Sequence, residues 1–210
     1  MILSFVFLQF IIKIVMITRL AIMASGNGTN AQRIMEYFSL KSPTRIELLL
    51  CNNPEAFVLE RAKNLKVPAI LFDRKEFYET RHILDVMSLQ GIDWIILAGF
   101  LWLIPLHILS FYPNRIINIH PALLPKYGGK GMYGMKVHES VIRNKEKESG
   151  ITIHYVNEVY DEGQIILQEK CPVISGDTPE TLAERVHELE YLWYPKVIEK
   201  VIGGRQGKDF

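Results

Sequence analysis

The chain alternates short apolar runs with stretches that repeat apolar residues at helical spacing. The apolar runs predict strands, of which the first five are Arg19–Ala24, Ile46–Cys51, Pro68–Phe72, Trp94–Ala98 and Ile116–His120. The amphipathic stretches predict helices over Asn30–Phe38, Phe57–Leu65, Phe77–Gln90, Pro105–Phe111, Lys136–Asn144 and Pro179–Val201. This alternation predicts an α/β fold, in which a mainly parallel, twisted sheet is flanked by helices.

The pattern changes after the fifth strand. A glycine-rich loop is expected over Lys126–Gly134. Thr152–Val156 and Ile165–Pro172 are joined by a link too short for a crossover, so we expect a late antiparallel strand pair. The closing helix contains Pro195, where we expect a bend or a break.

The first fifteen residues are strongly apolar, interrupted by Gln9 and Lys13. They are too short for a membrane span, which needs about 20 apolar residues, and they lack the basic start of a signal peptide. Met16 precedes a complete first strand, so we expect translation to begin near Met16, with residues 1–15 a non-native or disordered extension and 16–210 a single domain. A membrane anchor is the alternative interpretation of residues 1–15.

Composition excludes several classes of function. Apolar residues make up 49% of the chain, and 24 basic against 23 acidic side chains give a net charge of +1, so the broad basic surface of a nucleic-acid binder is not expected. Cys51 and Cys171 stand far apart and indicate core residues in a reducing, cytoplasmic setting. The six histidines show no metal-ligand spacing, and we predict no metal.

A glycine-rich turn over residues 25–31 follows the first strand and opens a helix. Backbone N–H groups and the helix N-terminus can there hold a phosphate or carboxylate. The turn lacks the Lys-Ser/Thr of a P-loop but matches the G-x-G-x-x-A dinucleotide fingerprint. Cys51, Asn52 and Asn53 stand where a dinucleotide site needs an acidic residue, which disfavours that reading. A simple tight turn is the other alternative.

Asn118 and His120 lie two apart on the fifth strand, so their side chains point to the same face at the strand's carboxyl end. A carboxamide and an imidazole that converge on one oxygen can stabilise the oxyanion of acyl transfer. Asp161, in the loop between the late strands, could orient His120 and favour its charged form. On spacing alone, a core histidine and a turn aspartate are the plain alternatives. Because no Ser or Cys occupies a nucleophile elbow, direct transfer is favoured over a covalent intermediate.

Four segments, SGNGTN, LAGF, NIHPALLPKY and DEGQIILQ, occur in one order over nearly the whole chain. Together they resemble the formyltransferase family that uses 10-formyltetrahydrofolate, and within it the members that act on glycinamide ribonucleotide in purine synthesis. The resemblance implies a Rossmann-like formyltransferase fold, formyl folate as cosubstrate, small-molecule partners only, and a monomer or homodimer without nucleic acid or membrane.

The resemblance also assigns roles by residue. It implies catalysis by Asn118, His120 and Asp161: the amine attacks the formyl carbon, Asn118 and protonated His120 hold the oxyanion, and Asp161 accepts the amine's proton through a water. It implies ribonucleotide binding by Gly28, Thr29, Asn30, His187 and Glu190. It implies folate binding by Lys75 (or Arg74), Leu101, Trp102, Leu103, Ile104, Asn118, Asn157 and Asp161.

Trp102 departs from the family pattern, since relatives often carry Arg at this place. Among the relatives that share the catalytic trio, a methionyl-tRNA formyltransferase would need a further domain and a basic face, and a formyltetrahydrofolate deformylase would need an N-terminal regulatory domain. A sugar-nucleotide formyltransferase and a non-catalytic phosphometabolite-binding module stay open as alternatives.

Overall fold

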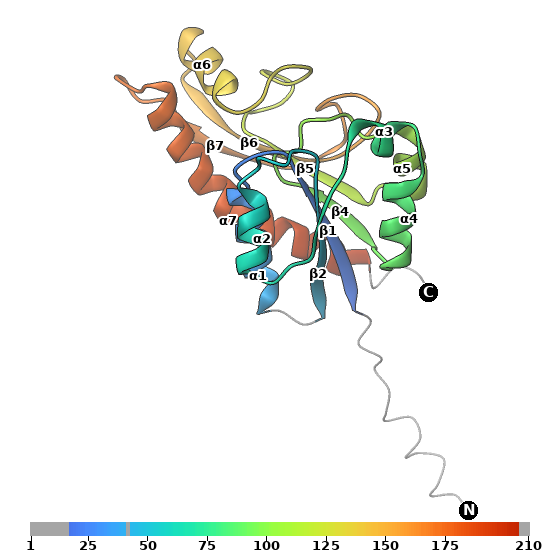
Figure 1. The fold of residues 1–210 in the computed structure, drawn as a ribbon. Helices are drawn as coiled ribbons and strands as arrows, with labels where there is room; N and C mark the ends of the chain where they lie inside the picture. The colour runs from blue at the N-terminus through green and yellow to red at the C-terminus, as the bar shows by residue number, and fades with distance from the viewer. Residues whose placement is uncertain (1–16, 41–42, 206–210) are drawn as a thin grey trace, which may run out of the picture.

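The computed structural model describes residues 17–40 and 43–205 (Figure 1). Seven strands form one sheet: β1 (Thr18–Ala24), β2 (Thr44–Cys51), β3 (Ala69–Leu71), β4 (Trp94–Leu97), β5 (Ile116–His120), β6 (Glu148–Tyr155) and β7 (Ile165–Pro172). The helices are α1 (Thr29–Ser39), α2 (Val58–Asn64), α3 (Arg74–Tyr78), α4 (His82–Leu89), α5 (Leu106–Phe111), α6 (Met135–Arg143) and α7 (Pro179–Arg205). The predicted start at Met16 and the extension before it lie outside the described residues.

The strand order is β3-β2-β1-β4-β5-β6-β7. Strands β1 to β5 pair in parallel, whereas β5 with β6 and β6 with β7 pair antiparallel. The predicted mainly parallel sheet with a late antiparallel pair is therefore confirmed.

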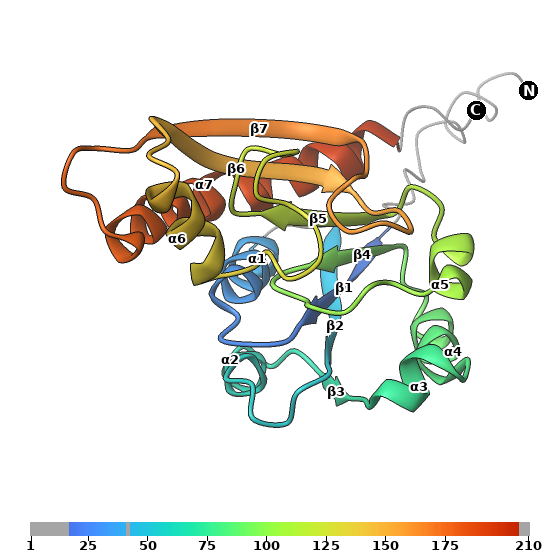
Figure 2. The ribbon, with the colours of Figure 1, turned by 90° about the horizontal axis from the view of Figure 1, so that it is seen from above.

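Two apolar layers sandwich the sheet (Figure 2). Alternate residues of β1 serve both layers: Leu20 and Ile22 belong to the layer under α1, α2 and α7, and Ala21 and Met23 to the layer under α3, α4 and α5. Both faces of β1 are thus buried, which is why its sequence is a continuous apolar run. Each fully buried Leu or Ile contributes about 1.5–3 kcal/mol of transfer free energy.

One predicted helix is wrong in its bounds. The Phe77–Gln90 prediction is replaced by two helices, α3 and α4. Asp73 caps α3, which begins three residues earlier at Arg74: the Asp73 carboxylate accepts the N–H of Glu76, and the Glu76 carboxylate accepts the N–H of Asp73. Thr80 separates the helices, because its hydroxyl donates to the Glu76 carbonyl and accepts the N–H of His82.

Helix α7 continues through Pro195 to Arg205, so of the two predicted outcomes, a bend or a break, the break does not occur. Tyr194 anchors this part of the helix to the sheet: its side chain is fully buried, and its hydroxyl lies 2.8 Å from the Leu97 carbonyl and 3.0 Å from the Ile117 carbonyl. No helix among the described residues is long and apolar enough to cross a bilayer.

Candidate active site

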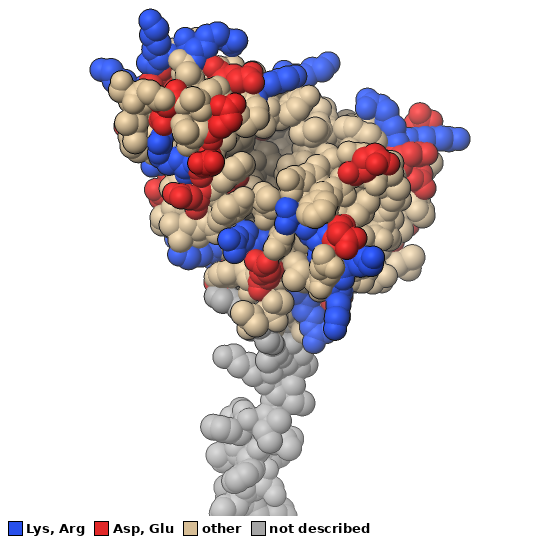
Figure 3. Space-filling view, turned by 60° about the vertical axis from the view of Figure 1, so that its left-hand side comes forward, with Lys and Arg blue, Asp and Glu red and all other residues tan. Residues whose placement is uncertain are grey.

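A cavity of about 640 Å³ opens at the carboxyl ends of β1, β4 and β5. The chain turns from β1 toward β2 on one side and from β4 toward β5 on the other, so the loops that leave β1 and β4 diverge there. Figure 3 shows the molecule hollowed between two masses at this edge, with charged side chains mainly outside the hollow. The volume suits substrates of metabolite size.

The loop after β1 brings the N-terminus of α1 to the cavity wall. Gly28 is the N-cap residue of this helix in the left-handed conformation (φ 77°), and no side chain among the described residues forms a capping hydrogen bond there. A Cβ at Gly28 would lie 2.4 Å from Cβ of Val58, so only glycine fits. The first helical N–H groups, at Thr29 and Asn30, lack intrahelical partners and can receive an anion.

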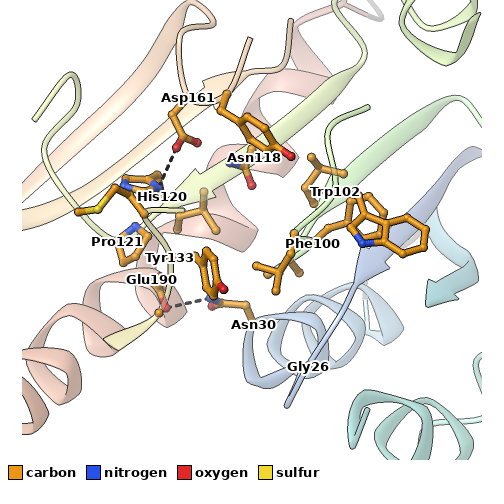
Figure 4. A pocket seen from close by; sticks show the side chains of 18 of the residues that line it. Gly26, Asn30, Phe100, Trp102, Asn118, His120, Pro121, Tyr133, Asp161 and Glu190 are labelled. Carbon is orange, nitrogen blue, oxygen red and sulfur yellow. Dashed lines mark hydrogen bonds and ion pairs between the residues drawn. The ribbon is translucent and has the colours of Figure 1, made fainter. Parts of the chain in front are cut away.

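Asn118 and His120 project from β5 toward the cavity, as the alternation predicts (Figure 4). The Asn118 Nδ2 lies 3.2 Å from Nε2 of His154, its register partner on β6. The His120 Nε2 lies 2.7 Å from the Tyr127 carbonyl oxygen, in the glycine-rich loop. Buried Thr152, the register partner of His120, fixes the turn after β5, since its hydroxyl donates to the Ala122 carbonyl at 2.7 Å.

Asp161 reaches this pair from the loop between β6 and β7. Its Oδ2 lies 3.4 Å from Nδ1 of His120 and accepts the Gly129 N–H at 2.9 Å, and its Oδ1 lies 3.7 Å from Nε2 of His154. Burial by itself would raise the pKa of Asp161. The nearby His120 ring and the hydrogen bond from the Gly129 N–H outweigh burial and lower that pKa, so Asp161 is ionised.

The charge of His120 differs from the expectation. The Asp161 carboxylate and the Tyr127 carbonyl do favour the imidazolium, but burial outweighs both and lowers the pKa of His120 below its ordinary value. His120 is therefore neutral at pH 7 in this structure. Each ring nitrogen of His120 faces an oxygen, of the Tyr127 carbonyl or of the Asp161 carboxylate. A second proton on the ring would therefore be stabilised by an oxygen that is already in place.

A second polar group lies across the cavity from Asn118 (Figure 4). The buried Glu190 carboxylate on α7 accepts the Asn30 Nδ2–H at 2.9 Å and lies 2.8 Å from Nδ1 of His187. This hydrogen bond raises the pKa of His187, which favours its charged form. The structure thus brings Asn30, His187 and Glu190 together beside the α1 N-terminus, as the resemblance implies.

The segment Leu101–Ile104 lines the other end of the cavity, as expected. Trp102 packs on Phe72, Phe77 and Phe100, with ring centroids 5.8–6.2 Å away. The Arg74 guanidinium stacks over the Trp102 ring at 5.6 Å. The Trp102 ring thus holds the Arg74 guanidinium beside this end of the cavity.

Two expected folate contacts are not brought to the cavity. Lys75 does not line it, and Arg74, the alternative, is the cation that meets Trp102. The two are adjacent on α3, and neither is among the residues that line the cavity. Asn157 also does not line the cavity, because its Oδ1 accepts the Val159 N–H at 3.0 Å within the loop.

Sequence reasoning missed two buried histidines of the cavity wall, His138 on α6 and His154 on β6. His154 was detectable, since it interrupts an apolar strand on the face that Thr152 shares. His138 has no comparable signal. Its Nδ1 has no hydrogen-bond partner among the described residues, and burial, with the charge of His187, lowers its pKa to about 4.

Comparison with known proteins identifies the class. A family model described as formyl transferase matches residues 18–198, so the chain belongs to the formyl transferase family. Within residues 17–40 and 43–205, no group of three or more His, Cys, Asp and Glu side chains could hold a metal ion.

Two curated relatives match most of this chain. The chain is 40% identical over 186 residues to the chloroplastic phosphoribosylglycinamide formyltransferase of Arabidopsis thaliana, a match that covers 86% of this chain and 64% of that protein. This chain thus spans less than two thirds of that relative. It is 37% identical to the phosphoribosylglycinamide formyltransferase of Bacillus subtilis (strain 168), covering 88% of this chain and 95% of that one.

Solved structures of similar proteins have the same fold as this chain. Glycinamide ribonucleotide transformylase 1 from Geobacillus kaustophilus superimposes with a TM-score of 0.79 at 39% identity, over 88% of this chain and 98% of that chain. The corresponding enzyme from Symbiobacterium toebii superimposes with a TM-score of 0.81 at 33% identity, over 90% and 89% of the two chains.

Proposed function

We propose that this chain transfers the formyl group of 10-formyltetrahydrofolate to the amine of glycinamide ribonucleotide, a step of purine synthesis. The observation that carries the proposal is the meeting of Asn118, His120 and Asp161 in one cavity between an anion-binding helix N-terminus and an apolar wall. The names and lengthwise similarity of the bacterial relatives support the same substrates.

The two ends of the cavity suit the two substrates. The phosphate would lie on the N–H groups of Thr29 and Asn30, and the ribose hydroxyls would donate to the Glu190 carboxylate, with His187 beside them. The folate would lie along Leu101–Ile104, where the wall is apolar. The substrate amine and the formyl carbon would then meet near Asn118.

In the reaction, the amine nitrogen bonds to the formyl carbon, and the carbonyl electron pair moves to the oxygen. Asn118 has two Nδ2 hydrogens, one directed at His154, so the other can donate to this oxyanion. The amine's proton leaves toward His120 or, through a water, toward Asp161. A developing oxyanion favours imidazolium at His120, and the Asp161 carboxylate stabilises that charge. Breaking the carbon bond to N10 of the folate then restores the carbonyl, and N10 takes up a proton.

In this mechanism, His120 acts first by accepting the amine's proton and then through the positive charge of its imidazolium. Its Nε2 is engaged by the Tyr127 carbonyl in this structure, so direct contact with the oxyanion requires that loop carbonyl to move. The free hydrogen of Asn118 needs no such movement.

The finer partner and compartment assignments are part of the proposal. Two buried, unpaired cysteines, Cys51 and Cys171, suit a reducing compartment such as the cytoplasm. We propose small molecules as the partners, without metal, nucleic acid or membrane, and a monomer or homodimer.

The test follows the absorbance of a formyl-folate donor as candidate acceptors are added. Turnover is expected with glycinamide ribonucleotide and not with an amino-sugar nucleotide or methionyl-tRNA. In His120→Ala, kcat should fall about 100-fold or more, because general acid–base catalysis by one side chain contributes about 100-fold to 10,000-fold.

The His120→Ala protein must bind ribonucleotide with nearly wild-type affinity, since the phosphate loop is untouched. Retention of more than about a tenth of wild-type kcat would reject the proposed role of His120. Turnover with amino-sugar nucleotides alone would reject the proposed substrate.

A further inference from the structure

His154 is a buried histidine without a role in the trio. Its side chain is 2% exposed, and it lies beside Asn118 because residues 118 and 154 are register partners of β5 and β6. The backbone pairing therefore fixes the distance between the two side chains, independently of any loop.

The hydrogen bonds of His154 define its tautomer. Its Nδ1 lies 2.8 Å from the carbonyl oxygen of Tyr155, which can only accept, so Nδ1 carries the hydrogen. The neutral ring then has an unprotonated Nε2, which accepts the Asn118 Nδ2–H at 3.2 Å. Asp161 Oδ1 lies 3.7 Å from the same nitrogen, beyond hydrogen-bond distance, so Asn118 is the nearer partner.

This acceptor sets the orientation of the Asn118 amide. An unprotonated nitrogen attracts the NH₂ end of a carboxamide and repels its oxygen. With one Nδ2 hydrogen on His154, the planar amide has its second hydrogen in a fixed direction. A flipped amide would offer the reacting centre an oxygen, which would repel an oxyanion.

We propose that His154 is a positioning residue that holds Asn118 with its N–H toward the oxyanion, acting through the tautomer fixed by the Tyr155 carbonyl. The kinetic part rests on the proposed function, whereas the amide orientation does not. His154 touches no substrate in this proposal, so its removal lowers kcat and leaves KM for both substrates nearly unchanged.

Three substitutions distinguish the contribution of Nε2 of His154 from that of Nδ1. His154→Phe keeps a ring without an acceptor and should lower kcat about tenfold, the effect of one hydrogen bond of about 1.4 kcal/mol. His154→Gln places an amide oxygen near the position of Nε2 and should stay within about threefold of wild type. His154→Asn, whose shorter amide reaches only the position of Nδ1, is the matched control and should resemble His154→Phe.

A double-mutant cycle with Asn118→Ala decides whether His154 acts through Asn118. In the Asn118→Ala background, His154→Phe should change the remaining kcat less than about twofold. An undiminished tenfold loss in that background, or equal activity of the Gln and Asn variants, overturns the proposal. A variant that misfolds would show altered circular dichroism and KM, and the Gln variant still supplies the comparison.

A second readout requires no turnover. The Asn118 side-chain NH₂ signal in a ¹⁵N spectrum, assigned by its loss in Asn118→Ala, should show two distinct hydrogens, of which the downfield one shifts in His154→Phe and less in His154→Gln. An unchanged signal overturns the inference even if the enzyme is active. A shifted signal in a protein that does not use glycinamide ribonucleotide would reject the proposed function alone.

Discussion

Asp161→Asn removes the negative charge beside His120 while keeping the size of the side chain. The two side chains are 11% and 5% exposed, so water screens their interaction weakly. At the 3.4 Å that separates Oδ2 from Nδ1, Coulomb's law with an effective dielectric constant of about 20 gives about 5 kcal/mol for full charges. Because both charges are spread over several atoms, we take about half, 2–3 kcal/mol, as the loss when His120 becomes charged in the transition state.

This loss corresponds to a fall in kcat of about 30-fold to 150-fold. It is measured by donor absorbance with both substrates saturating. The pKa of His120 should also fall further below its ordinary value, because the carboxylate that raises it is gone, and the ring C–H signals of His120 in an NMR titration report this directly. Asp161→Glu, which keeps the charge, is the control. A kcat above a tenth of wild type, or an unchanged titration of His120, refutes the electrostatic reasoning.

Three further predictions concern stability and binding. His138 has a folded-state pKa of about 4 against an ordinary 6.5, so the unfolded chain binds its proton more readily and stability is lost as pH falls from 6.5 toward 4; thermal denaturation of His138→Leu should depend less steeply on pH in this window than that of wild type, and equal slopes would contradict the assignment. Tyr194→Phe removes the hydroxyl shared by two strand carbonyls and should lower the free energy of unfolding by about 1–3 kcal/mol in urea, with catalysis retained; a loss below about 0.5 kcal/mol would show the bond to be dispensable. Gly28→Ala forces a Cβ into a left-handed position against Val58 and should raise KM for the ribonucleotide about tenfold or more without changing KM for the folate, which steady-state kinetics would test.

Patterns that depend on local periodicity could be predicted from the sequence. Strands β4 and β5 are continuous apolar runs, and the alternation along β5 places Asn118 and His120 on one face. The glycine turn before α1 could be recognised from the sequence, because the free helix N-terminus that follows it depends only on neighbouring residues.

Features that depend on strand register, or on the combined effects of burial and neighbouring charges, could not be predicted from local periodicity. The antiparallel pair was expected, but its register with β5 was not, and that register brings His154 to Asn118. Asp161 raises the pKa of His120, as expected. That burial lowers this pKa by more follows only from the packed structure. Neither Arg74 nor Lys75 lines the cavity, and the place of both depends on the first turn of α3, which begins at Arg74 rather than at the predicted Phe77.

The site's position follows from the change of strand direction in the sheet. Parallel strands present all their carboxyl ends at one edge, so the loops after β1 and β4 bring the glycine turn and an apolar wall to the cavity. The antiparallel β6 runs back along β5 and supplies His154 from within the sheet, while its return loop carries Asp161 over the same edge. Polar groups that would be costly in the interior of a fully parallel sheet thus become hydrogen-bonded partners of one another. The proposed acyl-transfer centre lies at this junction between the parallel and antiparallel parts of the sheet.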